Sequence, residues 1–131
     1  MASTITIQDK TNLANPGYFW ELPVAEERLT VLELIKIRVF EEVEHYNAQQ
    51  SNLFRGLVQP TNAEQTLNGY TMSKRRTIDW EEQYKAAVEA FMGNGFLILV
   101  DDRQVTELDE IIEIHPETAI TFLKLVPLVG G

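Results

Sequence analysis

The residues of this sequence that could take part in chemistry stand at its end, where Gly130 and Gly131 follow an apolar segment. A terminal carboxylate has a pKa of about 3.5 and is ionised at neutral pH. In a partner's active site it can attack the α-phosphorus of ATP and form an acyl adenylate, which then passes the acyl group to a sulfur, an amine or a hydroxyl. Two glycines carry no Cβ atoms, so the backbone can enter a narrow channel and approach the phosphates closely. We therefore expect Gly131, with Gly130 beside it, to be the point of activation or conjugation.

The residues before the diglycine would hold the tail in that channel. Pro127 stiffens the approach and removes one backbone donor. Val126, Leu128 and Val129 are apolar and are expected to grip the partner. Because the sequence stops at Gly131, no protease would be needed to expose the tail. The competing interpretation is chance, since two glycines in a row occur at about one chain end in two hundred.

Leu123 and Leu125 are the other expected partner-binding residues. If the outer face of the sheet is open, they join Leu97 and Leu99 in an exposed apolar patch. If an inserted helix covers that face, all four belong to the core. The segment 96–100 is apolar on both faces, which favours a covered sheet.

Composition limits the classes of function. The 131 residues suit a single domain over 1–131, and the net charge of −9 argues against binding to a nucleic-acid backbone. Without cysteine the chain has no disulfide, no thiolate metal ligand and no cysteine nucleophile. No apolar run is long enough to span a membrane and no signal peptide is recognisable, so we expect a cytoplasmic protein.

Motifs for catalysis and for cofactors are missing from the sequence. His45 and His115 are its only histidines, and neither has a second ligand at metal-like spacing. The glycines in 93–95 read as a helix stop, not as a nucleotide-binding loop. No Ser–His–Asp arrangement can be proposed. We expect a protein that is not an enzyme and that holds no metal and no cofactor.

A strand hairpin is expected to open the chain. Residues 4–8 alternate polar and apolar side chains, as a half-buried strand does. Residues 15–17 (Asn-Pro-Gly) are strong turn formers. Residues 18–22 then form a second strand, which Pro23 should end.

The main helix is predicted to follow directly. Thr30 and Glu33 form a capping box, and no Gly or Pro interrupts the chain from Val31 to about Ala48. Apolar residues recur at helical spacing along this segment. Its solvated side is expected to carry Glu41, Glu42 and Glu44.

Residues 49–93 are interpreted as an insertion. Residues 49–77 read as a long loop with one helical turn at 53–57. A second helix should begin at the N-cap Asp79, with Glu82 completing a capping box, and should end at the glycines of 93–95. Strands are expected after it at 96–100, 103–105, 110–114 and 118–125, before the tail 126–131.

The order hairpin, helix, strand, short elements, last strand and tail resembles the β-grasp order of ubiquitin and its relatives. Residues 96–131 are similar to the second half of the prokaryotic sulfur-carrier proteins of molybdopterin and thiamine biosynthesis. The shared features are the apolar strand 96–100, the Asp101-Asp102 turn, the acidic segment 108–110, the last strand and the tail with Pro127. The insertion places the chain among divergent bacterial ubiquitin-like proteins. The expected fold is therefore an α+β, ubiquitin-like β-grasp with a mixed sheet, a main helix, and an inserted loop with a second helix.

This resemblance implies a protein modifier or a sulfur carrier, activated at its Gly-Gly carboxylate by a separate adenylating enzyme. It also allows a conjugating enzyme and a deconjugating protease as partners. Two alternatives remain open. The chain could be a non-covalent adaptor that uses the sheet face or the insertion, or a homo-oligomer whose apolar tail docks into a neighbouring protomer.

Overall fold

The computed structural model describes residues 3–11, 17–49, 53–60, 63–66, 69–72 and 77–125. Within these residues the chain is α+β, with a mixed five-stranded sheet and two helices. The elements follow the order β1 (Ser3–Lys10), β2 (Tyr18–Val24), β3 (Arg28–Thr30), α1 (Val31–Ala48), β4 (Leu53–Phe54), β5 (Ala63–Thr66), β6 (Gly69–Met72), α2 (Trp80–Met92), β7 (Phe96–Val100), β8 (Arg103–Val105), β9 (Ile111–Glu113) and β10 (Ala119–Lys124).

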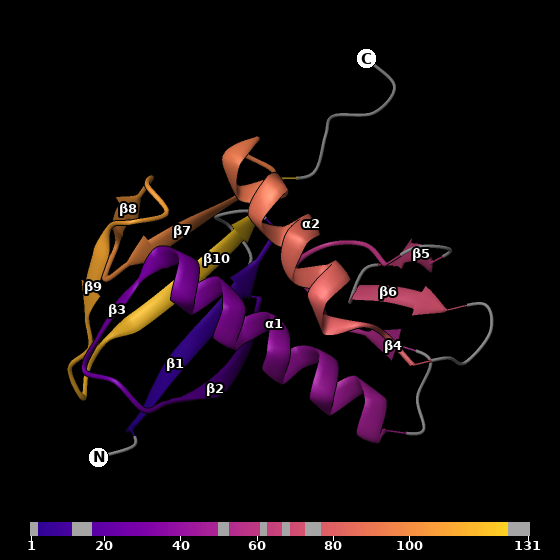
Figure 1. Cartoon of the computed structure of the whole chain (residues 1–131), viewed down its shortest axis with the longest axis horizontal. Helices are drawn as coiled ribbons and strands as arrows, with labels where there is room; N and C mark the ends of the chain where they lie inside the picture. The colour runs from indigo at the N-terminus through magenta and orange to yellow at the C-terminus, as the bar shows by residue number, and fades with distance from the viewer. Residues whose placement is uncertain are drawn as a thin grey trace.

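The main sheet has the strand order β2-β1-β10-β7-β8. β1 and β2 form the expected antiparallel pair. The last strand, β10, lies in the middle, parallel to β1 and antiparallel to β7. The first and the last strand of the described residues therefore pair in one sheet. This mixed sheet with a helix on one face is compatible with a β-grasp-like fold (Figure 1).

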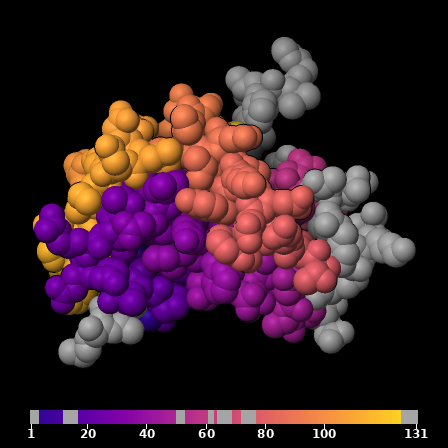
Figure 2. Space-filling view, viewed as in Figure 1, coloured from indigo at the N-terminus to yellow at the C-terminus, as the bar shows by residue number. Residues whose placement is uncertain are grey.

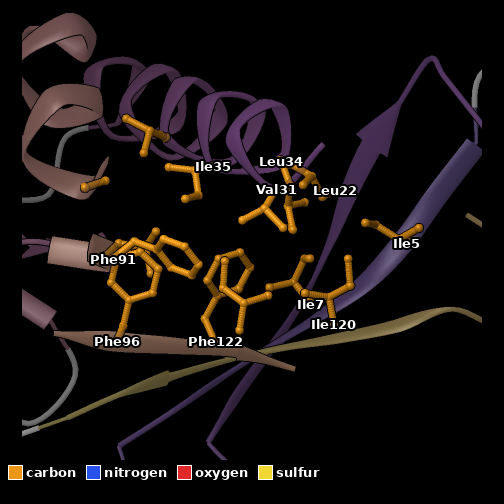
Figure 3. Packing of buried hydrophobic residues seen from close by; sticks show 14 of the residues in the cluster. Ile5, Ile7, Leu22, Val31, Leu34, Ile35, Phe91, Phe96, Ile120 and Phe122 are labelled. Carbon is orange, nitrogen blue, oxygen red and sulfur yellow. The ribbon is translucent and has the colours of Figure 1, made fainter. Parts of the chain in front are cut away.

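The core lies between this sheet and the two helices. Alternate residues of each strand point towards α1, as the period of a strand requires. In Figure 3 the side chains of Val31, Leu34 and Ile35 extend from α1 towards Ile7, Ile120 and Phe122 of the sheet. All six are fully buried. The apolar periodicity of the sequence therefore places most of the core correctly, although Phe40 of the same stripe is 41% exposed.

The start of α1 is confirmed to the residue. The Thr30 Oγ1 accepts a hydrogen bond from the Glu33 backbone N–H at 3.1 Å, and the Glu33 carboxylate accepts one from the Thr30 N–H at 3.2 Å. Together these bonds satisfy two backbone donors that the first helical turn leaves free. The helix extends from Val31 to Ala48, as predicted.

The start of α2 differs from the prediction in its capping bond, whereas its end follows the prediction. Asp79 is the N-cap, but its carboxylate accepts from the N–H of Glu81, and no capping box with Glu82 forms. After the helix, Asn94 takes the left-handed conformation with φ 61°, while Gly93 has φ −92°. The predicted stop at 93–95 is therefore confirmed, and within it Asn94 supplies the left-handed geometry, which asparagine tolerates better than most residues.

The loop predicted over 49–77 is wrong where the structure describes it. Residues 53–57 form no helical turn, because Leu53–Phe54 is strand β4 of a second sheet with the order β4-β6-β5. Gly69 has φ 149°, and a Cβ there would lie 2.5 Å from the Phe54 carbonyl oxygen. Strands of two to four residues carry too little alternation to be recognised in a sequence.

Two further differences from the predicted strands arise from how strands pair in the sheets. Pro23 does not end β2, which continues to Val24 with Pro23 opposite Thr4. β2 is an edge strand, so the missing N–H of a proline can face away from the ladder. Residues 28–30, not predicted as a strand, pair with Ile111–Glu113 in a two-stranded sheet.

The second helix covers the same face of the sheet as the first. α2 packs against α1, and Figure 2 shows the two helices side by side. The Phe91 ring of α2 lies 5.8 Å from that of Phe96, which in turn lies 6.1 Å from Phe122 of the core. The expectation that the inserted helix covers the outer face is therefore wrong. The outer-face residues Leu97 and Leu99 of β7 are nevertheless half-buried, so this face is partly covered, but not by the inserted helix.

Candidate functional site

The predicted tail, Val126, Pro127, Leu128, Val129, Gly130 and Gly131, lies outside the described residues. The residues immediately before it are held firmly. The N–H of Leu125 donates to the Gly95 carbonyl at 3.0 Å, and Lys124 Nζ donates to the Gly56 carbonyl at 2.6 Å. The tail therefore starts from a fixed point, between the turn after α2 and the segment after β4.

Leu123 and Leu125 do not form one exposed patch. Leu123 alternates with the core residues Ile120 and Phe122, so it belongs to the outer face, yet only 8% of it is exposed. Leu125 is 44% exposed. Leu97 and Leu99, the outer-face residues of β7, are half-buried. Of the predicted pair, only Leu125 offers a partner a substantial surface.

A cavity of about 590 Å³ lies between β2, the second half of α1 and β4, and no sequence pattern predicted it. We call it the aromatic–acidic cavity. Its lining includes Tyr18 and Trp20 of β2, Glu41, Glu42 and Tyr46 of α1, and Arg55 after β4. Glu21, His45, Gln49 and Leu53 complete the described part of the wall.

An arginine is completely buried beside this cavity. Arg38 Nη2 donates to Asp9 Oδ2 at 2.7 Å, and Arg38 Nε donates to Glu42 Oε2 at 2.9 Å. The other Glu42 oxygen accepts from the backbone N–H of Leu57 at 3.3 Å. The triad Asp9–Arg38–Glu42 therefore connects β1, α1 and the segment after β4.

The electrostatics of the triad follow from its burial. Burial by itself lowers the pKa of the Arg38 guanidinium, but the attraction and hydrogen bonds of Asp9 and Glu42 outweigh burial and raise that pKa. Burial raises the pKa of Glu42, and the opposing attraction of Arg38 offsets only part of the rise. The guanidinium Cζ also lies 4.4 Å from the Phe122 ring and 5.2 Å from the Trp20 ring. Such contacts add cation–π attraction.

The expectation that Glu42 lies on the solvated side of α1 is wrong, because only 8% of it is exposed. Glu41 is half-buried and Glu44 is exposed. A usable signal was present in the sequence. Arg38 and Glu42 are four residues apart on the apolar face of α1, the spacing at which a helix brings opposite charges together.

A second hollow of about 520 Å³ lies near the β7–β8 turn and is lined by Arg28 and Arg103 among others. Both arginines already have carboxylate partners. Arg28 lies 3.8 Å from Glu113, and Arg103 lies 2.8 Å from Glu110. The arginines of the second hollow are therefore less available to a ligand than the side chains that line the aromatic–acidic cavity.

Across the described ranges, no group of three or more His, Asp or Glu side chains is arranged to hold a metal ion. Neither described helix is long and apolar enough to cross a membrane.

Comparisons with protein-family models, with curated proteins and with solved structures found no match to this chain.

Proposed function

We propose that this chain is a ubiquitin-like β-grasp protein that acts through the carboxylate of Gly131. A separate adenylating enzyme would activate that carboxylate, and the chain would then serve as a protein modifier or a sulfur carrier. The observation that carries the proposal is the position of the last strand. β10 lies in the centre of the sheet, between β1 and β7, and the diglycine follows it in the sequence.

A tail that begins at residues held in place by hydrogen bonds suits the activation of its carboxylate by a partner. Residues 124 and 125 are held by the hydrogen bonds to Gly56 and Gly95. A partner that docks on the folded body would therefore find the first residue of the tail at a constant place. Positioning of this kind lowers the entropic cost of bringing the carboxylate to a reactive phosphorus.

The proposed step needs ATP from the partner. A carboxylate oxygen of Gly131 forms a bond to the α-phosphorus, and the bond from that phosphorus to the β-phosphate bridging oxygen breaks. The products are the acyl adenylate and pyrophosphate. A sulfur, amine or hydroxyl nucleophile then bonds to the carbonyl carbon, and AMP leaves.

Intact mass spectrometry of the protein from its native cell tests this proposal. A sulfur carrier should gain the mass of one oxygen-to-sulfur exchange. A modifier should appear as a covalent adduct that contains Gly131 at the junction. If the chain is found only in unmodified form, under conditions in which its function is active, the proposal fails.

A second candidate function, the non-covalent adaptor, is favoured by the outer face of the sheet, on which neither helix lies. Both helices cover the other face. Phe19 of the edge strand β2 is 56% exposed on the outer side, and Leu125 is also accessible. An adaptor would bind its partner without the diglycine, and mutations on this face would abolish the binding.

The burial of Leu123 determines which mutation can test the adaptor. We expect Leu123→Asp to lower the free energy of unfolding by about 2–4 kcal/mol, because it places a charge where only 8% of the side chain is exposed. Leu125→Asp should lower it by less than about 0.5 kcal/mol. Urea denaturation measures both values.

Leu125→Asp is therefore the mutation that tests partner binding without unfolding the protein. Leu123→Met changes packing at the buried position without adding a charge, so it is the control for Leu123→Asp. Equal stability of the two aspartate variants would contradict the burial difference. A partner that still binds Leu125→Asp and a Phe19→Asp variant would exclude the outer face as its docking surface.

A further inference from the structure

The walls of the aromatic–acidic cavity are suited to positive charge. Tyr18, Trp20 and Tyr46 contribute aromatic rings to it. The electron-rich faces of such rings attract guanidinium and ammonium groups. The chain itself uses two of the rings in this way. Arg55 Cζ lies 4.4 Å from the Tyr18 ring, and Arg38 Cζ lies 5.2 Å from the Trp20 ring.

The charges around the cavity favour the same class of ligand. Three lining residues carry carboxylates, Glu21, Glu41 and Glu42, whereas Arg55 is the one described lining residue with a permanent positive charge. Glu42 is paired with Arg38, but no ion pair joins Glu41 to any described residue. The wall therefore holds a half-buried carboxylate beside aromatic rings.

The end of α1 adds to this bias. Tyr46 and Gln49, which also line the cavity, stand at the last turn of the helix and at its C-cap. The carbonyl groups of a helix C-terminus carry a partial negative charge and stabilise a nearby cation. The rings of β2, the Glu41 carboxylate and the C-terminal end of α1 therefore all favour a positively charged ligand.

We propose that the aromatic–acidic cavity binds an organic cation, a guanidinium or ammonium group on an apolar stem. The stem lies against Tyr18 and Trp20, and the charged group approaches Glu41. A volume of about 590 Å³ is of the size that holds small ligands or a peptide side chain with its backbone. The inference stands apart from the diglycine, because no step of it involves residues 126–131.

Arg55 has a defined part in this proposal. Its side chain is exposed, and its guanidinium rests on the Tyr18 ring. It therefore competes with an incoming cation for that ring. If the cavity binds cations, removing the charge of Arg55 should strengthen that binding. If the cavity binds anions, the same change should weaken binding, because it removes the main attractive charge.

The test is an NMR titration of the full chain with Nα-acetyl-L-arginine amide (below, arginine amide). Nα-acetyl-L-citrulline amide (below, citrulline amide) is the neutral probe of nearly equal shape, because acetylation removes the charge of the α-amino group. The chain has two tryptophans, so two indole N–H resonances report separately. Trp20 lines the cavity, and Trp80, on α2, does not. We expect arginine amide to shift the Trp20 resonance, and citrulline amide to bind at least about fivefold more weakly.

Two substitutions and a matched control sharpen the result. Glu41→Gln should weaken arginine amide about three- to fivefold, and Arg55→Gln should strengthen it. Glu44→Gln, on the exposed side of the same helix, should leave the affinity unchanged. Thermal melts of all three variants check that the fold is intact.

The proposal is overturned if arginine amide leaves the Trp20 resonance in place, or if citrulline amide binds equally well. It is also overturned if inorganic phosphate shifts Trp20 and Arg55→Gln abolishes that shift, which would assign the cavity to anions. Two further probes identify the source of the cation. Tighter binding of the peptide acetyl-Gly-Arg-Gly-amide points to a partner protein, and tighter binding of agmatine points to a free small molecule.

Discussion

Removal of Gly131 is expected to abolish activation of this protein and to leave its fold unchanged. The deletion withdraws the carboxylate by about 3.5 Å, the length of one extended residue. Even a displacement of about 1 Å from reactive geometry can reduce a rate about a hundredfold. We therefore expect the covalent adduct or the thiocarboxylate form to disappear when the truncated chain replaces the original in the native cell, as measured by intact mass spectrometry.

The control for this truncation is a variant that keeps the length of the chain. Gly130→Ala retains the carboxylate at its distance but adds a Cβ, so it should reduce activation only if the partner's channel is narrow. Residue 131 lies beyond β10, so the thermal melt of the truncated chain should match that of the original. Persistent modification after loss of Gly131 would refute the proposed function and would leave the aromatic–acidic cavity unaffected.

Arg38→Met is expected to lower the free energy of unfolding by about 3–5 kcal/mol. Methionine keeps much of the apolar stem but leaves Asp9 and the buried Glu42 without their shared cation. Leaving a buried carboxylate without its partner lowers stability far more than the intact ion pair raised it. Urea denaturation at neutral pH measures the loss.

The double variant Arg38→Met with Glu42→Gln should recover a large part of that stability. The amide carries no charge, and its oxygen can still accept the hydrogen bond from the Leu57 N–H. Lys36→Met, on the exposed side of α1, is the matched control and should change stability by less than about 1 kcal/mol. A loss below about 1 kcal/mol for Arg38→Met would show that the triad does not depend on its cation.

The sequence by itself determined the elements whose signals are local. The capping box of Thr30 and Glu33 and an uninterrupted apolar stripe defined both ends of α1. Five consecutive apolar residues between a helix stop and two aspartates defined β7. In each case the residues that carry the signal are neighbours along the chain, so no tertiary contact was needed to read them.

Features that depend on distant residues were decided by the tertiary structure. The small sheet β4-β6-β5 escaped prediction because its strands gain stability from each other and not from a pattern of their own. The helix α2 packs on α1, where the ring of Trp80 meets the ring of Phe40 edge-on with centroids 5.6 Å apart. The periodicity of α2 does not indicate which face of the sheet the helix covers.

The same distinction separates the two candidate sites. The diglycine can be read from the sequence because its chemistry belongs to adjacent residues. The aromatic–acidic cavity exists only in the fold, because its walls come from β2, α1 and the segment after β4. The structure also buries Glu42, which the sequence pattern had placed on the solvated side of α1. A side chain's environment is set by the segments that pack around it, and those segments are remote in sequence.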